Sequence, residues 1–322
     1  MKKIFIAPIA GVTDYTYRGI LEEFQPDLLF TEMVSSDALA ALNDKTISQI
    51  LRLRSGNGVQ LFGKDTEKMI YSAKYIEKLG VKNIDINAGC PMKRVVHSGH
   101  GSALLKSPEK IKEILFTLRE QLEESTKLSI KIRVGYDRPE NYLQIAKIAE
   151  EAGCSHITVH GRTRAQLYTG LADWSLIKEI KEHVTIPVIG NGDIFTAEAA
   201  KEKIEDSGVD GVMLARGIFG NPWLIRDIRE MLQYGEVKTK VSTEDKIDMA
   251  IHHILKTEED NPQREFVFDV RKHICWYLKG IPHSAEYKNR INQSTDYKAV
   301  VQLLQELKEK IKGESQWHQK PL

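Results

Sequence analysis

The sequence predicts an α/β protein made of a (β/α)8 TIM barrel followed by a C-terminal all-helical domain. Eight short apolar runs, rich in Ile, Val and Leu, alternate with amphipathic stretches up to about residue 235. Such runs are typical of parallel strands that are covered on both faces. Eight strand–helix units over roughly 235 residues favour a closed barrel over an open sheet. No strand pattern follows, so we expect the barrel over residues 1–238 and the helical domain over 239–322.

The eight strands are expected where apolar runs are bounded by polar or turn-forming residues. They are Lys3–Ala7, Leu28–Thr31, Gly58–Leu61, Asn83–Asn87, Ser129–Arg133, His156–His160, Pro187–Gly190 and Gly211–Ala215. Helical periodicity between the strands predicts helices over Thr66–Lys78, Pro108–Gln121 and Asn141–Glu151. The same periodicity predicts helices in the second domain over Thr243–Glu258, Phe266–Lys279 and Ala299–Lys312. We expect the tail after Gly313 to fray.

The composition of the 322 residues is that of an ordinary globular protein. Hydrophobic residues make up 41% and charged residues 28%, which excludes a disordered or collagen-like chain. The 46 basic and 45 acidic residues leave a net charge of +1, so the overall field does not indicate a nucleic-acid binder. The three cysteines include no C-x-x-C pair, which favours the cytoplasm and at most one reactive thiol.

The sequence gives no sign of a membrane segment. No apolar run approaches the about 18–20 residues that span a bilayer. Lys2 and Lys3 precede the apolar stretch Ile4–Ala10, which leaves a signal peptide as an alternative. Pro8 and Gly11 interrupt that stretch and favour a first buried strand.

Polar residues follow the expected strands at their carboxyl ends, the edge at which TIM barrels carry their active sites. Two of these loops have the composition of a phosphate site, Gly190-Asn191-Gly192-Asp193 and Ala215-Arg216-Gly217. Glycines let backbone N–H groups approach phosphate oxygens, and Arg216 adds a charged donor. Tight turns without a ligand are the alternative. Other polar residues at this edge are Glu32, Gln60, Asn87, His160 and Arg162.

Lys131 and Arg133 lie two residues apart on the expected fifth strand, so both side chains point to one face. In a barrel, that face is the interior, where two cations are costly without an anion. An anionic ring, a phosphate or a substrate carbonyl would relieve the cost. A salt bridge to a carboxylate such as Glu32 is the alternative.

Cys90 follows the expected fourth strand directly, and Pro91 excludes the α conformation at Cys90. A free thiol with a pKa of about 8.5 is mostly protonated at neutral pH. Cys90 is therefore as plausible a proton donor as a nucleophile. Inert packing is the alternative here, and it is the expected role of Cys154 and Cys275.

Two segments concentrate positive charge. Residues 88–106 contain no acidic residue but carry Lys93 and Arg94, a composition that favours a lid over an anionic substrate. Residues 271–298 interleave aromatic residues with cations that include Arg271 and Lys272, which suits a phosphate backbone and unstacked bases. A solvated loop and a solvated helix face are the respective alternatives.

Taken together, the chain resembles the bacterial tRNA-dihydrouridine synthases, and most of all their type B branch. The resemblance covers nearly the whole chain, from Ile6 to about Asp296. Its landmarks are APIAGVTD at Ala7–Asp14, VQLFG at Val59–Gly63, DINAGCP at Asp85–Pro91, KIR at Lys131–Arg133, VHGRTR at Val159–Arg164, GNGDI at Gly190–Ile194, ARG at Ala215–Gly217 and VRKHICWYL at Val270–Leu278. The chain departs from the usual pattern of the family at Ile9 and at Ala215-Arg216.

The resemblance implies an FMN-dependent enzyme that reduces the C5=C6 bond of uridines in the D-loop of tRNA, with NADPH as the reductant. FMN contacts are implied at Pro8, Ile9, Ala10, Gln60, Lys131, His160, Asn191, Gly192, Asp193, Ala215 and Arg216. Substrate contacts are expected at Asn87, Arg133, Lys93, Arg94, Arg162, Arg271 and Lys272. Cys90 is implied as the acid that protonates C5 after hydride reaches C6, and a bound metal is not expected. We expect a cytoplasmic monomer.

Other functions remain open on the sequence alone. A flavin enzyme of the dihydroorotate or dihydropyrimidine type, acting on a free small molecule, would lack the basic helical domain. A synthase directed at ribosomal RNA and an RNA-binding protein without catalysis are further alternatives. A phosphosugar aldolase or isomerase would use the same phosphate loops, with Lys131 forming a Schiff base.

Overall fold

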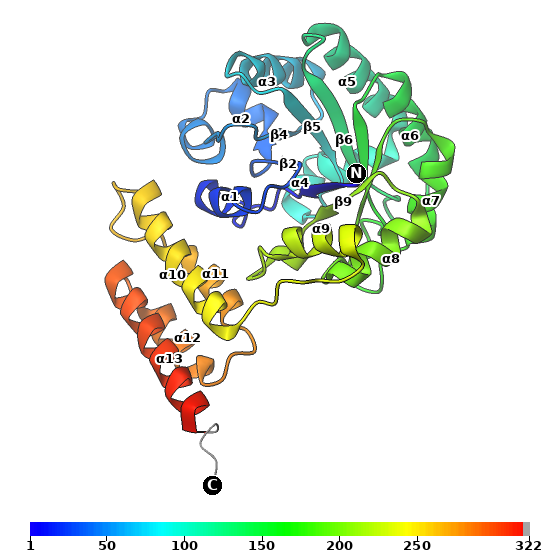
Figure 1. The fold of residues 1–322 in the computed structure, drawn as a ribbon. Helices are drawn as coiled ribbons and strands as arrows, with labels where there is room; N and C mark the ends of the chain where they lie inside the picture. Colours follow the sequence, from blue (N-terminus) through cyan, green and yellow to red (C-terminus); the bar gives the residue numbers. More distant parts are fainter. Residues whose placement is uncertain (318–322) are drawn as a thin grey trace.

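Residues 1–317 are described by the computed structural model of the protein, and in them nine short strands form one curled sheet. All neighbouring strands in the sheet are parallel, and helices surround it (Figure 1). The strands are β1 (Lys3–Ile6), β2 (Leu28–Leu29), β3 (Val34–Ser35), β4 (Val59–Phe62), β5 (Asn83–Ala88), β6 (Lys127–Arg133), β7 (His156–His160), β8 (Val188–Asn191) and β9 (Gly211–Leu214).

The two edges of the sheet, β2 and β3, are consecutive pieces of one stretch of chain. Phe30 bridges Gly58, and the Gly58 amide donates to the Leu29 carbonyl at 2.9 Å. The Thr31 amide in turn donates to the Gly58 carbonyl at 2.9 Å. These bonds join the stretch 28–35 to the strand beginning at 59 and close the barrel. The predicted TIM barrel is confirmed, but its second strand is interrupted, and its two-residue second piece was too short to predict.

The barrel helices include three that the sequence predicted. Helices over Thr66–Lys78 and Pro108–Gln121 are confirmed at both ends. The Asp65 carboxylate caps the first by accepting from the Lys68 amide at 3.1 Å, and Pro108 begins the second. The helices are α1 (Tyr15–Glu22), α2 (Ser36–Ala40), α3 (Thr66–Lys78), α4 (Lys93–His97), α5 (Pro108–Gln121), α6 (Tyr142–Glu151), α7 (Trp174–His183), α8 (Ala197–Ser207) and α9 (Leu224–Tyr234), with short turns η1 (Thr46–Ile50), η2 (Gly101–Lys106) and η3 (Arg216–Ile218).

Residues beyond α9 form a bundle with a hydrophobic core of its own. The helices are α10 (Thr243–Asp260), α11 (Val270–Tyr277), α12 (Ser284–Gln293) and α13 (Tyr297–Trp317). Buried apolar side chains from all four helices make up this core, for example Ile254, Ile274, Ile291 and Leu304. No helix among residues 1–317 is both long and apolar enough to cross a membrane.

The bundle differs from the sequence prediction in three places. Helix α11 is shorter than the expected Phe266–Lys279, and α12 was not predicted. The sequence of α12 is polar, and few of its side chains, such as Tyr287 and Ile291, are buried. The apolar periodicity was therefore too weak to predict a helix. Helix α13 continues through Trp317, so the expected fraying does not begin at Gly313; residues 318–322 lie outside the described part.

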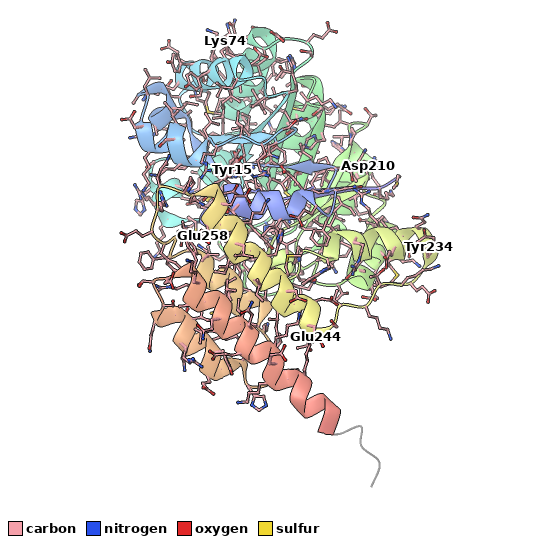
Figure 2. All side chains as sticks on the ribbon, turned by 60° about the vertical axis from the view of Figure 1, so that its left-hand side comes forward. Tyr15, Lys74, Asp210, Tyr234, Glu244 and Glu258 are labelled. Carbon is pink, nitrogen blue, oxygen red and sulfur yellow. The ribbon has the colours of Figure 1, made fainter. Side chains whose placement is uncertain are left out.

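The bundle packs against the barrel along α1 and the η3 loop. Helix α10 lies beside α1 in both views (Figures 1 and 2). The ring of Tyr17 stacks on that of His253 with centroids 5.4 Å apart, and Phe219 stacks on Trp276 at 4.3 Å. His252 of α10 also lies 2.9 Å from the Glu23 carboxylate. The bundle therefore rests directly on the loop that follows β9.

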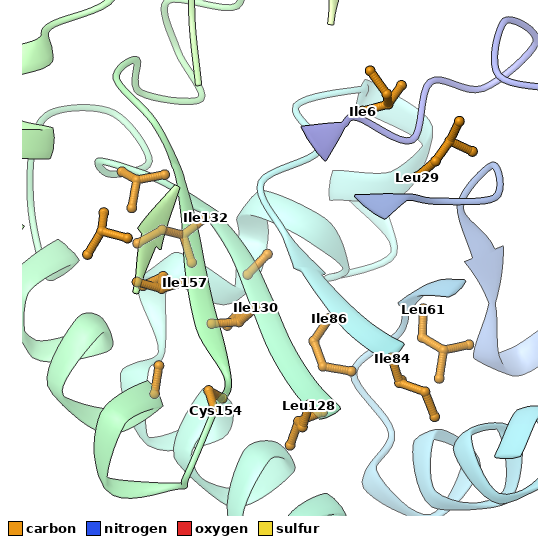
Figure 3. Close-up of a cluster of buried hydrophobic side chains, with 14 of the residues drawn as sticks. Ile6, Leu29, Leu61, Ile84, Ile86, Leu128, Ile130, Ile132, Cys154 and Ile157 are labelled. Atoms are coloured by element: carbon orange, nitrogen blue, oxygen red, sulfur yellow. The ribbon is translucent and has the colours of Figure 1, made fainter. Parts of the chain in front are cut away.

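Alternation along the strands separates an apolar exterior from a polar interior. On β5 and β6, Ile84, Ile86, Leu128 and Ile130 belong to the core shared with the surrounding helices (Figure 3). The residues between them, such as Asp85, Ser129 and Lys131, carry polar groups on the opposite face. A smaller apolar cluster fills part of the interior, made of Phe5, Ala7, Leu28, Phe30, Ile189 and Met213.

Close packing of the bundle on the barrel predicts a large effect of Gly220→Ala. A Cβ at this residue, whose φ is +65°, would lie 2.4 Å from the backbone carbonyl carbon of Trp276. Gly235 has φ +82° and nothing within 4 Å, so Gly235→Ala is the matched control for conformational strain alone. We expect the control to lose about 1–2 kcal/mol. Gly220→Ala should lose about 1–3 kcal/mol more in the free energy of unfolding measured with urea. Equal losses would contradict the close contact.

Candidate active site

Two adjoining cavities open at the carboxyl ends of the strands. They measure about 290 and 250 Å³ and share the lining residues Ile9, His160, Tyr168, Asn191 and Ala215. Between them they are lined by most of the residues that the sequence singled out. These residues are Pro8, Ile9, Ala10, Gln60, Asn87, Cys90, Lys131, Arg133 and His160, and Asn191, Gly192, Asp193, Ala215 and Arg216.

Lys131 and Arg133 extend from β6 toward the larger cavity, and among the described residues neither forms a salt bridge. The Lys131 ammonium donates to Asn191 Oδ1 at 3.3 Å. Burial, reinforced by the neighbouring Arg133, lowers the pKa of Lys131 to about 8. The alternative of a bridge to Glu32 is not found, because that carboxylate accepts from the Gly11 amide.

Arg133 is 2% exposed and uses its guanidinium to fix two loops. It donates to the carbonyls of Gly89 at 3.0 Å, Thr163 at 2.8 Å and Leu167 at 2.9 Å. Burial lowers the pKa of this guanidinium to about 10, so Arg133 remains charged at neutral pH. The two cations thus add positive charge to the interior, and the buried Asp85 carboxylate, which favours the charged form of Lys131, opposes it in part.

Cys90 is held in a turn whose backbone groups are hydrogen-bonded. Asn87 Oδ1 accepts from the amides of Gly89 at 3.1 Å and Cys90 at 2.9 Å. Ser102 donates to the Cys90 carbonyl from both its amide and its hydroxyl, at 3.1 and 2.9 Å. Burial raises the pKa of the thiol, although Arg133 and Lys131 oppose this effect. The thiol is therefore protonated at neutral pH and lines the same cavity as Lys131.

Pro91 and Met92 line the larger cavity, and the basic loop beyond them lines neither cavity. Lys93 and Arg94 begin the exposed helix α4, and their predicted contact with substrate remains a prediction. The loop returns to the thiol at Gly101, whose added Cβ would lie 2.9 Å from the Cys90 carbonyl oxygen. The side chain of His100 is nearly buried, 3.5 Å from Asp37. The segment around His100 and Gly101 is thus packed against the barrel, whereas α4 is exposed to solvent.

Asp193 in the smaller cavity is bound by two arginines. Arg162 Nη2 lies 2.9 and 2.7 Å from its two oxygens, and Arg216 Nη2 lies 3.1 Å from Oδ1. Burial alone would raise the pKa of Asp193, but hydrogen bonds from the Ala172 amide and Arg162 outweigh it and lower that pKa. Its carboxylate therefore holds Arg216 at the cavity.

Arg162 is 1% exposed, and its observed contacts are with the protein. Its predicted contact with substrate stays a prediction. It donates to Nε2 of His160 at 3.3 Å, which leaves the proton of a neutral imidazole on Nδ1. Burial, together with the nearby arginines and Lys131, lowers the pKa of His160 well below its usual value, so the ring is neutral.

Arg271 and Lys272 lie on α11, away from the two rim cavities, and line a shallow cavity of about 430 Å³ with Phe268 and Trp276. Arg271 donates to the carbonyls of Asn292 at 2.7 Å and of Ser294, at the end of α12. Its guanidinium thus caps a helix, and its predicted RNA contact remains untested. The Lys272 ammonium pairs with Asp269 at 2.9 Å and lies 3.5 Å from a Cβ built on Gly11, at the barrel rim.

Sequence reasoning missed two residues of the site. Tyr168 lines both cavities and lies under the guanidinium groups of Arg216 at 4.8 Å and Arg133 at 5.7 Å. Its signal was an aromatic residue in the rim loop that follows β7. Asp85 is a carboxylate that is 0% exposed, inside β5, and a charge in a predicted buried strand was the available signal.

The polar groups around the cavities suit an elongated anion. Lys131 presents an ammonium group at one end, Arg216 a partly exposed guanidinium at the other, and the neutral His160 lies between them. An unpaired ammonium beside a protonated thiol suits a ring that carries negative charge, and Arg216 with the glycine loops suits a phosphate. Among residues 1–317 no group of three His, Cys, Asp or Glu side chains is arranged to hold a metal.

Comparison with known proteins places this site in a family. The sequence model of the dihydrouridine synthase family matches residues 5–314. A probable tRNA-dihydrouridine synthase of Rickettsia conorii is 39% identical over 94% of this chain and 92% of its own. A tRNA-dihydrouridine synthase B of Pasteurella multocida is 35% identical over 92% and 90%.

Solved structures support the same fold at much lower identity. Histamine dehydrogenase from Rhizobium sp. 4-9 superposes with a TM-score of 0.52 at 12% identity, over 80% of this chain and 48% of its own. A 2-naphthoyl-CoA reductase superposes with a TM-score of 0.55 at 12% identity, over 71% and 50%. At 12% identity, these likenesses show the fold alone. The family match over nearly the whole sequence, with relatives that align over 92–94% of it, shows that the chain belongs to the dihydrouridine synthase family.

Proposed function

We propose that the protein reduces uridines of tRNA to dihydrouridine, with FMN as the bound cofactor and NADPH as the reductant. Membership of the family and the names of the relatives support the reaction. The observation that carries the proposal is the pairing of a protonated Cys90 thiol with the Lys131 ammonium in one cavity at the barrel mouth. The D-loop of tRNA is the proposed target.

The residues around the two cavities fit FMN. Lys131, with no salt bridge, would face the flavin ring, and Arg216 with the amides of the glycine loops would bind the phosphate. Pro8, Ile9 and Ala10, which follow β1, line the larger cavity. When bound, FMN reduced by NADPH would supply a hydride to C6 of the uracil ring. Lys131 would stabilise negative charge near the flavin ring.

The role of Cys90 follows from the electron balance. Addition of a hydride to C6 moves the C5=C6 electron pair toward C5 and the C4 carbonyl, so C5 must gain a proton. The thiol supplies that proton and becomes a thiolate, which Arg133 and Lys131 stabilise before solvent reprotonates it. Asn87, whose Nδ2 has only the weak acceptor Met33 Sδ for its second hydrogen, is the proposed contact for a uracil carbonyl.

We propose that residues 1–238 form the catalytic domain and residues 239–322 the tRNA-binding domain. The target base must leave its stack to reach the thiol, so the rest of the RNA has to be held outside the barrel. Lys272 lies at the junction of bundle and rim, and Lys93 and Arg94 project from α4. These cations are the proposed contacts to phosphates. A cytoplasmic location and a monomeric state remain predictions.

Cys90→Ala is expected to retain FMN and its reduction by NADPH, because the thiol takes no part in that half-reaction. Dihydrouridine formation should fall at least about 100-fold, the usual contribution of a general acid. NADPH oxidation is followed by absorbance and dihydrouridine in tRNA by mass spectrometry. Cys154→Ala, which truncates a buried cysteine in the barrel core, is the control and should keep full yield. Full yield from Cys90→Ala would remove the thiol from the mechanism.

The raised pKa of Cys90 predicts the pH dependence of its alkylation. Only the thiolate reacts, so below the thiol pKa the rate rises about tenfold per pH unit. The rate with iodoacetamide should therefore climb from pH 7 through pH 9 without a plateau, as measured on the Cys90 peptide by mass spectrometry. A plateau by pH 8 would mean that the thiol is already ionised, and the proposed acid role would be untenable.

Lys272→Glu is expected to weaken tRNA binding and to reduce the slope of log Kd against log salt by about 1, because one phosphate contact is lost. NADPH oxidation without tRNA should be unchanged. Lys147→Glu is the matched control, since Lys147 also pairs with a carboxylate three residues away, but on α6. Arg271 is left intact because its loss would also uncap α12. If both variants bind tRNA alike, the bundle face around Lys272 does not contact the RNA.

A further inference from the structure

A chain of buried hydrogen bonds connects the barrel interior to the turn that carries Cys90. Ser129 Oγ and Gln60 Nε2 each donate to the Asp85 carboxylate at 2.6 Å. Gln60 Oε1 then accepts from Asn87 Nδ2 at 2.6 Å, and Asn87 Oδ1 accepts from the Cys90 amide at 2.9 Å. The exposed fractions are 0% for Gln60 and Asp85, 2% for Ser129 and 4% for Asn87, so water does not compete for these groups.

The Asp85 carboxylate determines which group donates and which accepts in each hydrogen bond of this chain. An ionised carboxylate only accepts hydrogen bonds, so Gln60 must turn its NH2 group toward Asp85 and its oxygen toward Asn87. That oxygen in turn requires the NH2 group of Asn87. The remaining Asn87 oxygen is then directed at the amides of Gly89 and Cys90. An amide in place of Asp85 would permit both directions.

The charge of Asp85 has partners of its own. Burial raises the pKa of Asp85 to about 6, against the hydrogen bonds from Ser129 and Gln60 and the charge of Lys131. The charge of Asp85 also helps to raise the pKa of the Cys154 thiol, which is therefore protonated. With this pKa, the carboxylate is mostly ionised at pH 7.5 and mostly protonated at pH 5.

We propose that Asp85 is a positioning residue that orients the amides of Gln60 and Asn87 and thereby holds the Cys90 turn in place. The inference rests on the proposed function in one respect, that the Cys90 thiol donates the proton. It predicts that loss of Asp85 impairs protonation of the base more than reduction of the cofactor by NADPH. It also predicts that the position of the carboxylate within this series of hydrogen bonds determines how well the Cys90 turn is held.

Hydrogen exchange of the Gly89 and Cys90 amides tests this directly, measured by mass spectrometry on the flavin-loaded protein at pH 7.5. Asp85→Asn should speed exchange of the peptide spanning residues 86–92 at least about tenfold, because the amide acceptor is lost in part of the population. Ser129→Ala removes a bond to Asp85 but keeps the carboxylate, so it should exchange within about twofold of the wild type.

The double variant Asp85→Asn/Asn87→Asp moves the carboxylate to the other end of the chain. The new amide at position 85 would then donate to Gln60 Oε1, and Gln60 Nε2 would donate to the new carboxylate at position 87. That carboxylate would still accept from the Gly89 and Cys90 amides, so we expect exchange to return to within about twofold of the wild type. A merely structural effect of losing Asp85 would not be rescued by this second change. Unchanged exchange in Asp85→Asn, or no rescue in the double variant, would overturn the proposal.

Two further measurements keep the test decisive. If Asp85→Asn does not fold, the wild type at pH 5, where Asp85 is protonated, should show the same loss of protection after correction for intrinsic exchange. In a folded Asp85→Asn, the amount of dihydrouridine formed per NADPH oxidised should fall at least about tenfold. Failure of the proposed function looks different, because a wild type that forms no dihydrouridine would still show protected Gly89 and Cys90 amides.

Discussion

The Lys131 ammonium in the barrel interior, which forms no salt bridge in the described chain, is the constraint on which the site depends. A buried cation is costly, and here only the Asn191 side-chain oxygen at 3.3 Å accepts from it. The barrel supplies this arrangement by alternation, because Leu128, Ile130 and Ile132 face the helices while Lys131 and Arg133 face inward. An anionic ligand at the barrel mouth would offset the desolvation free energy of the buried Lys131 ammonium.

Protonation states around this cation are set by burial and by hydrogen bonds. Cys90 stays a thiol, His160 stays neutral, and Asp85 stays ionised at neutral pH. Cys90 can thus donate a proton, the neutral His160 can donate a hydrogen bond, and the Asp85 carboxylate accepts hydrogen bonds within the barrel. Asp193 is saturated by Arg162 and Arg216, so it orients a cation without adding negative charge to the cavity. The result is a site that suits an anion beside an acid.

The fold and the cavity residues could be predicted where local patterns carry the information. The apolar runs and proline or glycine boundaries predict α3 and α5 to the residue, and the glycine loops mark the smaller cavity. Tertiary partners could not be predicted. Arg162 and Arg271 look like free cations in the sequence, but their donors bind Asp193 and the end of α12. Helix α12 was missed because its stability comes from packing on the bundle.

The stereochemistry of the product tests the central claim most directly. If the thiol and the cofactor act from opposite sides of the uracil ring, reduction of tRNA in D2O with NADPH deuterated at C4 adds deuterium to opposite faces at C5 and C6. Dihydrouridine isolated from such a reaction and examined by proton NMR should carry deuterium at C5 and C6 in the trans arrangement. Deuterium on the same face at both carbons would contradict protonation by Cys90 across the ring.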